Sequence, residues 1–360
     1  MQPDVKSRAG KAAVAEHSPG PEAPGAAAVS PRGQLDVHRP SWVARLVRDP
    51  QYVTYLGVVL LAIVLALVFG KEKMAQLTVF GLAEGALFSL GAVGLTLVFG
   101  VLNLVNFAHG ELITFAAYMT IIFNVALGFP LVFAALISMA LTAVFALTTE
   151  LAIWKPMRKV GAGMFQTMLM SIGLMFVVRY VIQMVSGTKI RQFNVDPAAT
   201  YSILGLHVGE SQAWTIIIGL PALVAIGLLL KFTSIGKQMR AISDDRSLAE
   251  IAGINTAATI RYMWILAGAA AGITGVLGGW LLSTWPELGF KLLLPIFAVV
   301  VLGGAGNAFG ALAGGLLLGL MIEWSTLIIP YSYKMVVGFV VLIIVMVIRP
   351  TGVLATAKVK

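Results

Sequence analysis

The sequence predicts an all-α, polytopic membrane protein of about ten transmembrane helices, some of them interrupted near a pore. Hydrophobic residues make up 59% of the 360 residues and charged residues only 11%, whereas a soluble globular domain carries about 25% charged residues. The apolar residues also stand in long blocks bounded by short polar stretches. Lipid offers no partner to unpaired backbone groups, so such blocks are expected to form helices.

Each apolar block is measured against the length that crosses the hydrocarbon, which is about 20 residues with a range of about 17 to 25. The first and eighth blocks are short by this measure. The predicted spans lie near residues 54–70, 78–101, 109–128, 130–153, 165–186, 212–231, 261–283, 290–305, 309–329 and 334–348.

The two ends of the chain differ from this apolar part, which covers residues 51–354. Residues 1–50 are rich in Pro, Ala and Gly and have no apolar period, so they are predicted to be a disordered extension. No apolar core with a cleavage site precedes Tyr52, which argues against a secretory signal. Residues 355–360 are predicted to be a short tail.

The basic residues predict the orientation of the spans. Most of the 25 Lys and Arg residues fall in the N-terminal extension, the loops after the fourth and sixth spans, and the C-terminal tail. With ten spans all four segments lie on one side of the membrane, and basic segments favour the cytoplasmic side. We therefore expect both termini in the cytoplasm. The net charge of +9 is spread over these flanks and does not form a nucleic-acid patch.

The first polar stretch inside the apolar part is GVLNLVNFAHGE, residues 100–111. It brings Asn103, Asn106, His109 and Glu111 to a place where lipid penalises polar groups. The stretch is either a polar turn between helices or part of a substrate pathway. His109 lacks a second His or carboxylate at a ligand spacing, so no metal site is predicted.

The second stretch is VLGGAGNAFGALAGG, residues 301–315, which contains six glycines. Glycine allows close helix packing and unusual backbone angles. Broken helices in transporters expose backbone groups to a polar solute. Close packing and a substrate pathway both remain open for this run. Its candidate pathway residues are Gly303, Gly304, Gly306 and Asn307.

Few other charges lie inside the predicted spans. Glu84, Arg179 and Glu323 are expected toward the outer halves of their helices, and Glu150 lies in the fourth span. An ion pair between Arg179 and either Glu84 or Glu323 would lower the cost of burying both charges. We expect such a structural ion pair; a proton relay would need several acidic residues along a path.

The basic loop 231–261 is predicted to contain a short amphipathic helix lying across the membrane plane. Asp244 or Asp245 can cap its N-terminus, and Gly253 can end it. Leu248, Ile251 and Ala252 follow helical spacing and form an apolar face. This helix either docks on a cytoplasmic partner or rests on the lipid surface. The candidate docking residues are Asp244, Asp245, Leu248, Ala249, Ile251 and Gly253.

The sequence argues against an enzyme. It contains no G-x-x-x-x-G-K-[ST] phosphate loop, so any ATP hydrolysis is expected on another polypeptide. Cysteine is absent, which excludes thiol nucleophiles, disulfides and thiolate metal sites. No nucleophile and base stand in a recognisable constellation. We therefore expect this chain to bind no cofactor.

Four runs together resemble the branched-chain amino acid importer permeases of the LivH type. They are GLTLVFGVLNLVNFAHGELITFAAY at 94–118, GKQMRAISDDRSLAEIAGIN at 236–255, VVVLGGAGNAFGALAGGLLLGLMIE at 299–323 and RPTGVL at 349–354. They cover the chain from about residue 75 to 354, in the order of that family. The first two runs are specific in combination.

This resemblance implies a permease subunit of a bacterial inner-membrane ATP-binding-cassette importer for branched-chain or related hydrophobic amino acids. The implied partners are a second permease subunit, cytoplasmic ATPase subunits that bind ATP, and a periplasmic or lipid-anchored solute-binding protein. The helix around residues 244–253 would dock on the ATPase. The loop 187–211 is expected on the outer face, where the binding protein would meet it.

Two alternatives stay open at this point. A permease of the same family for urea or short amides would share these motifs, and Asn103 and Asn106 suit such solutes equally well. A stand-alone ion-coupled carrier or channel is the alternative of another class. It would need a midplane carboxylate for the ion, and the cytoplasmic helix of loop 231–261 counts against it.

Overall fold

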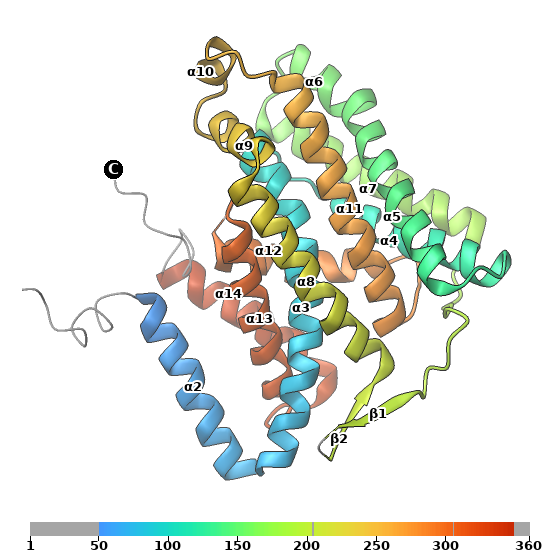
Figure 1. The fold of residues 1–360 in the computed structure, drawn as a ribbon, viewed down its shortest axis with the longest axis vertical. Coiled ribbons are helices and arrows are strands. Elements are labelled where there is room, and N and C mark those ends of the chain that lie inside the picture. Colours follow the sequence, from blue (N-terminus) through green and yellow to red (C-terminus); the bar gives the residue numbers. More distant parts are fainter. Residues whose placement is uncertain (1–49, 204, 305, 349–360) are drawn as a thin grey trace, which may run out of the picture. The chain divides into compact units, whose positions relative to one another are not determined.

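The computed structural model describes residues 50–203, 205–304 and 306–348. These residues form a helical bundle with one short hairpin, shown in Figure 1. The predicted extension before residue 50 and the tail 355–360 lie outside the described residues. The helices are α2 Pro50–Phe69, α3 Lys71–Leu102, α4 His109–Ile121, α5 Leu131–Thr149, α6 Lys155–Lys159, α7 Met164–Ser186, α8 Glu210–Phe232, α9 Ser234–Asp244, α10 Arg246–Ile251, α11 Thr256–Leu282, α12 Leu288–Gly303, α13 Ala308–Ser325 and α14 Lys334–Ile348.

Three short turns complete the helical part. The π-helical turns η1, Ile122–Ala126, and η2, Glu150–Trp154, continue α4 and α5, and the 3₁₀ turn η3, Tyr331–Tyr333, precedes α14. The strands β1, Thr200–Ile203, and β2, Leu206–Gly209, pair antiparallel, with Tyr201 opposite Val208.

The prediction of an all-α polytopic membrane protein is confirmed, and a helix lies at each of the ten predicted spans. Within the described residues, six helices are long and apolar enough to cross a membrane. Shorter apolar helices lie at Leu56–Phe69, Leu288–Gly303 and Tyr331–Val347. α4 has 13 residues and continues through η1. The sequence analysis did not predict the β1–β2 hairpin. Its apolar residues do alternate with polar ones, but each strand has only four residues, which is too short for a distinct pattern.

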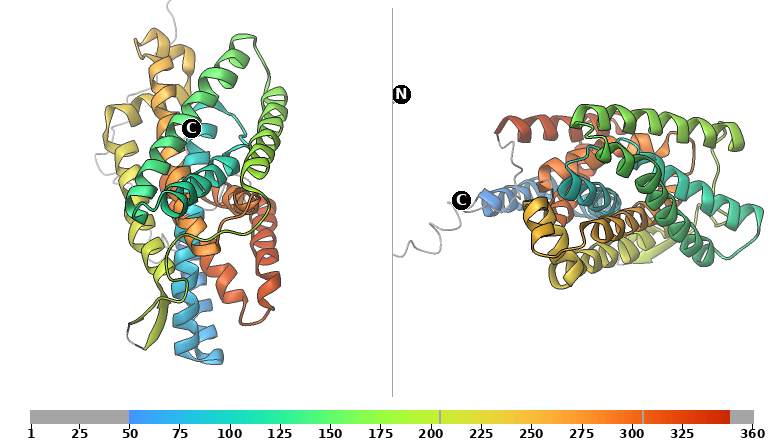
Figure 2. Two further views of the ribbon diagram at one scale, coloured as in Figure 1. Left: turned by 90° about the vertical axis from the view of Figure 1, so that its right-hand side faces the viewer. Right: turned by 90° about the horizontal axis from the view of Figure 1, so that it is seen from above.

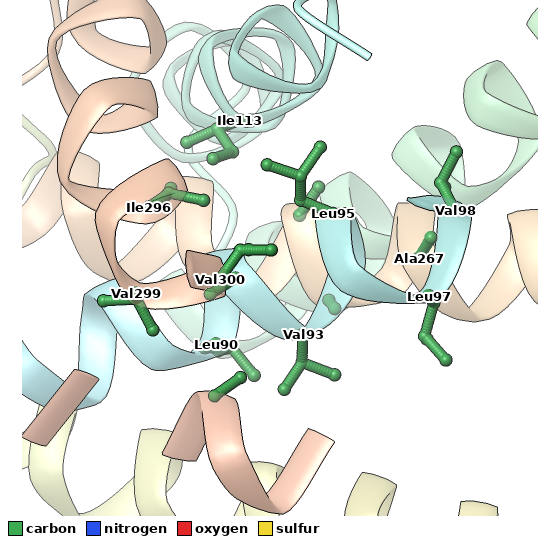
Figure 3. Packing of buried hydrophobic residues seen from close by; sticks show 14 of the residues in the cluster. Leu90, Val93, Leu95, Leu97, Val98, Ile113, Ala267, Ile296, Val299 and Val300 are labelled. Atoms are coloured by element: carbon green, nitrogen blue, oxygen red, sulfur yellow. The ribbon is translucent and has the colours of Figure 1, made fainter. Parts of the chain in front are cut away.

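The centre of the bundle is α3, which is buried almost continuously from Ala83 to Val98. Small residues allow α3 and α13 to pack backbone against backbone. A Cβ added to Gly319 of α13 would lie 2.4 Å from the carbonyl oxygen of Gly81. Figure 3 shows the apolar side chains of α3 interlocked with those of α4, α11 and α12 around Leu95.

Two groups of connecting elements lie at opposite ends of the bundle (Figures 1 and 2). At one end the β1–β2 hairpin meets α3, where the Gln76 side chain donates to the His207 carbonyl oxygen and accepts from its backbone N–H. At the other end lie α6, α9 and α10. The basic loops around Lys155 and Arg240 therefore share one end, as the count of spans requires.

Candidate functional site

The first interruption separates α3 from α4. Asn103 follows α3 in a left-handed conformation with φ of 50°, and its N–H donates to the Phe99 carbonyl oxygen at 2.8 Å. The Asn106 side chain is buried and accepts from the Ala108 N–H at 3.1 Å. Local hydrogen bonds thus satisfy part of the backbone that the missing helical turn leaves open.

After this interruption, α4 begins inside the bundle and not at its end. The Nε2 atom of His109 lies 3.0 Å from the carbonyl oxygen of Gly91 in α3. Gly91 stands eleven residues before the last residue of α3, which corresponds to roughly 16 Å along the helix axis. The segment 103–108 therefore runs back alongside α3, and His109 is fully buried when α4 starts.

The first turns of α4 and α12 meet at two glycines. A Cβ added to Gly289 would lie 1.7 Å from the carbonyl oxygen of Gly110, so neither helix tolerates a side chain at this contact. The Gly289 N–H donates to Thr114 Oγ1 at 3.0 Å. Both ends are helix N-termini, which carry partial positive charge. Two such ends inside a membrane bundle favour a nearby negative group.

Glu111 in the first turn of α4 is that negative group. Its Oε1 atom accepts from Arg179 of α7 at 2.6 Å from Nη2 and 3.0 Å from Nε, and both side chains are buried. The guanidinium carbon of Arg179 also lies 4.5 Å from the centre of the Phe290 ring of α12. This pair joins three helices around the meeting point of α4 and α12.

The predicted partner of Arg179 was wrong. Glu84 and Glu323 do not face Arg179; both accept from Lys334 Nζ, at 2.6 and 2.5 Å. Sequence position places a residue at a depth in the membrane, but the rotation of its helix decides which neighbour it faces. The sequence signal that was missed is Lys334 itself, a cation at the first position of the last apolar block.

The second interruption lies between α12 and α13 and is built from backbone. Gly304 and Gly306 have φ of 83° and 87°, a region that favours glycine. A Cβ on Gly303 would lie 2.3 Å from the carbonyl carbon of Gly310. Asn307 caps α13, since its Oδ1 accepts from the Gly310 N–H at 3.1 Å. The glycine run therefore provides tight packing at a break between two helices, and its role in a substrate pathway stays a prediction.

The predicted pathway residues lie at two different depths in the helical bundle. Gly306 lies against Gly100 near the end of α3, where Asn103 begins the first interruption, whereas His109 and Glu111 lie deeper. Asn106 lines a space of about 10 Å³, room for about one water molecule. This space is too small for an amino acid.

The predicted surface helix is α10. Asp245, and not Asp244, caps it, with Oδ1 accepting from the N–H groups of Ser247 at 2.8 Å and Leu248 at 3.0 Å. These bonds, the one from Leu248 first, hold the pKa of Asp245 below its ordinary value. Gly253 follows the helix with φ of 82°. Asn255 then caps α11 by accepting from the Ala258 N–H at 2.9 Å.

The apolar side chains of α10 point away from the bundle. Leu248 is 64% exposed and Ile251 is 83% exposed, whereas Ala249 is buried against the protein. A short helix that faces its apolar side outward leaves a surface that lipid or a partner can cover. Docking on a partner stays a prediction, and so does the pathway role of the two interruptions.

Comparison with known proteins gives one family. Residues 77–346 match the family model described as "Branched-chain amino acid transport system / permease component". The high-affinity branched-chain amino acid transport system permease protein LivH of Escherichia coli K12 is 27% identical over 297 residues, which cover 78% of this chain and 95% of LivH.

Two further relatives agree with this match. BraD of Pseudomonas aeruginosa, which carries the same description, is 27% identical over 79% of this chain and 97% of its own length. A probable branched-chain amino acid transport permease protein LivH of Methanocaldococcus jannaschii is 28% identical over 74% of this chain and 88% of its own. No solved structure gives a significant match.

Proposed function

Since this chain belongs to the permease family of branched-chain amino acid transport systems, we propose that it is the permease subunit of an ATP-driven importer. Its solutes would be branched-chain or related hydrophobic amino acids, and separate ATPase subunits would supply the energy. The observation that carries this proposal is the family match over residues 77–346. The absence of a phosphate loop from the sequence agrees with ATP hydrolysis on a partner.

The surface of α10 supports a partner at the end of the bundle that carries α6 and α9. Leu248 and Ile251 are exposed at a spacing of three residues, so they form one apolar edge on a helix that Asp245 and Gly253 delimit. An apolar edge on a short helix fits a hydrophobic groove on a partner. We assign that groove to the ATPase, which would move α10 when it closes on ATP.

The first interruption supports the position of the solute path. A zwitterionic amino acid needs polar partners for both its charges, and hydrogen bonds that are unmade in lipid are costly. Asn106, His109 and Glu111 bring polar side chains inside the bundle, next to two helix N-termini. Because the space at Asn106 is too small for an amino acid, transport requires α4 and its neighbours to separate there.

The first experiment is purification of the tagged chain from its native membrane, followed by mass spectrometry of the proteins that come with it. We expect an ATPase subunit, a second permease and a solute-binding protein. The complex is then placed in proteoliposomes with the binding protein, and leucine and urea are titrated. Stimulation of ATP hydrolysis by leucine supports the proposal. Stimulation by urea alone would make urea the solute in place of an amino acid. Solute uptake by this chain alone contradicts the proposal of an ATP-driven importer.

The docking role of α10 has a matched control. Ile251→Asp places a charge on the exposed edge and is expected to abolish recovery of the ATPase. Ile190→Asp makes the same change at a residue that is 69% exposed in the segment after α7, and it should leave recovery unchanged. Equal recovery of the ATPase with both variants would show that α10 is not its docking site.

The orientation can be measured directly because the chain has no cysteine. We propose that α6, and with it both termini, faces the cytoplasm of the bacterial inner membrane. Lys159→Cys in α6 should then react with a membrane-impermeant maleimide only after the cells are opened. Lys189→Cys, after α7, should react in intact cells. The opposite pattern would invert the topology.

A further inference from the structure

A cavity of about 310 Å³ lies at the end of the bundle that carries α6 and α10. Its walls come from η2, α6, the first residue of α10 and the first two turns of α11. Figure 1 shows α6 and α10 at the same end of the bundle. It is separate from the two interruptions and from the exposed edge of α10. The charged residues that line it are Glu150, Lys155, Arg158, Lys159, Arg246 and Arg261.

The charge of this cavity is strongly positive. Glu150 pairs with Arg158, and Arg246 pairs with Glu250 at 3.1 Å on the surface of α10. Within the described residues, Lys155, Lys159 and Arg261 form no ion pair. Three cations that face a shared space repel one another, and an anion placed among them would remove that repulsion. The cavity therefore favours a ligand that carries negative charge.

The walls of the cavity are held in place by two tryptophans behind it. Trp154 in η2 and Trp264 in α11 are buried and stack with their ring centres 6.1 Å apart and their planes 5° from parallel. This contact fixes the start of α6 against α11. The backbone that carries the basic side chains is thus held by contacts within the protein, and a rigid site lowers the cost of binding.

An apolar stripe leads from the cavity along the outer face of α5. Leu151 lines the cavity and is 45% exposed, and Val144, seven residues earlier on the same face, is 60% exposed. Between them, the exposed Thr148 donates its hydroxyl to the Val144 carbonyl oxygen at 2.9 Å, so this donor is satisfied within the helix. A ligand with an anionic head and an apolar tail would use the cavity and the stripe at once. An acidic protein segment would use only the cavity.

We propose that this cavity binds the phosphate of an anionic phospholipid, whose acyl chains lie along the exposed stripe of α5. Basic pockets between transmembrane helices recognise lipid head groups in this way. The bound phosphate would bridge Lys155 and Lys159 of α6 to Arg246 of α10 and Arg261 of α11. The lipid would therefore steady α10, whichever solute the protein carries.

The test is native mass spectrometry of the purified full chain, with any subunits that stay bound, titrated with phosphatidylglycerol or phosphatidylcholine. The unaltered protein should retain phosphatidylglycerol in preference. The variant K155Q/K159Q/R261Q should bind it roughly 100-fold more weakly, at about one decade or less for each base removed. The control K71Q/K73Q/K189Q removes the same charge at the opposite end and should bind as the unaltered protein does. K155R/K159R, which keeps the charge, should also retain the lipid.

Four results would overturn the proposal. They are equal retention of the two lipids, equal loss in the two glutamine variants, and displacement of the lipid by millimolar inorganic phosphate, which would make free phosphate the ligand. The fourth is unchanged lipid binding together with lost recovery of the ATPase in K155Q/K159Q/R261Q, which would assign the cavity to an acidic segment of that partner. A melting temperature close to that of the unaltered protein shows that each variant is folded.

Discussion

The two interruptions of the membrane helices are built in opposite ways. Between α3 and α4, polar side chains stabilise the interruption. Asn106 accepts a hydrogen bond from the backbone of Ala108, and His109 lies beside the Gly91 carbonyl oxygen. Between α12 and α13, the absence of side chains at Gly303 and Gly310 lets the two backbones contact each other. The first break depends mainly on side-chain hydrogen bonds, and the second depends on close packing together with the Asn307 cap of α13.

This difference separates a part that can change from a part that cannot. A hydrogen bond can be exchanged for one to a solute at little net cost, because only the unmade bond is expensive. A backbone contact such as Gly303 with Gly310 has no second arrangement of similar energy. We therefore expect the segment 103–108 to rearrange during transport, while the glycine contacts keep α12 packed on α13 and on the start of α4.

The largest effect is expected at the ion pair that anchors α4. Arg179→Met leaves the Glu111 carboxylate buried without its partner, which costs about 3–5 kcal/mol of folding free energy. The measurement is thermal unfolding in detergent together with the yield of folded protein. The double variant Arg179→Met, Glu111→Gln should recover much of the loss. Equal stability of the single variant and the unaltered protein would show that the pair does not hold α4.

A smaller loss is expected at the glycine break. Gly303→Ala forces a methyl group to within 2.3 Å of the Gly310 backbone, so the helices must shift, at a cost of about 1–3 kcal/mol. Gly173→Ala is the matched control, because a Cβ at that position in α7 meets nothing within 4 Å. If both variants unfold at the same temperature, the second break is not held by packing.

At the polar break we expect transport to suffer more than stability. Asn106→Leu removes one local hydrogen bond, which is worth about 1 kcal/mol, but it also removes a polar partner from the proposed path. Solute uptake and the melting temperature are measured on the same preparation. Asn124→Leu removes a buried Asn that bonds to Phe129 and Asn194 outside both breaks. Equal uptake in the two variants would make Asn106 a structural residue only.

The smallest effect is expected at Asp245, which caps the N-terminus of the surface helix α10. Asp245→Ala should remove the cap of α10 and speed hydrogen exchange at the Leu248 amide, whereas Asp245→Asn should keep the cap. Because the pKa of Asp245 is lowered in the folded protein, its stabilising effect is complete above its ordinary pKa of 3.8 and fades as the pH falls below that value. Protection that persists in Asp245→Ala at neutral pH would contradict the cap.

Local sequence patterns predicted the structural features that depend only on residues close together in the chain, such as helix positions and helix ends. The helices at the ten predicted spans follow from the length of apolar blocks, and the stop after α10 follows from Gly253, whose φ of 82° suits glycine. The break at residues 103–108 was visible because polar side chains interrupt an apolar run. In each case the cause lies within a few residues of the effect, so the sequence carries it directly.

The sequence by itself therefore determined the fold class, the positions of the apolar helices, the two places where they break and the family. Only the tertiary structure decided that Arg179 meets Glu111 and that Lys334 holds the two other glutamates. It also decided that α4 starts deep in the bundle and that the bases of α6, α10 and α11 share a cavity. These features depend on how each helix is rotated and packed, and that is set jointly by all the helices around it.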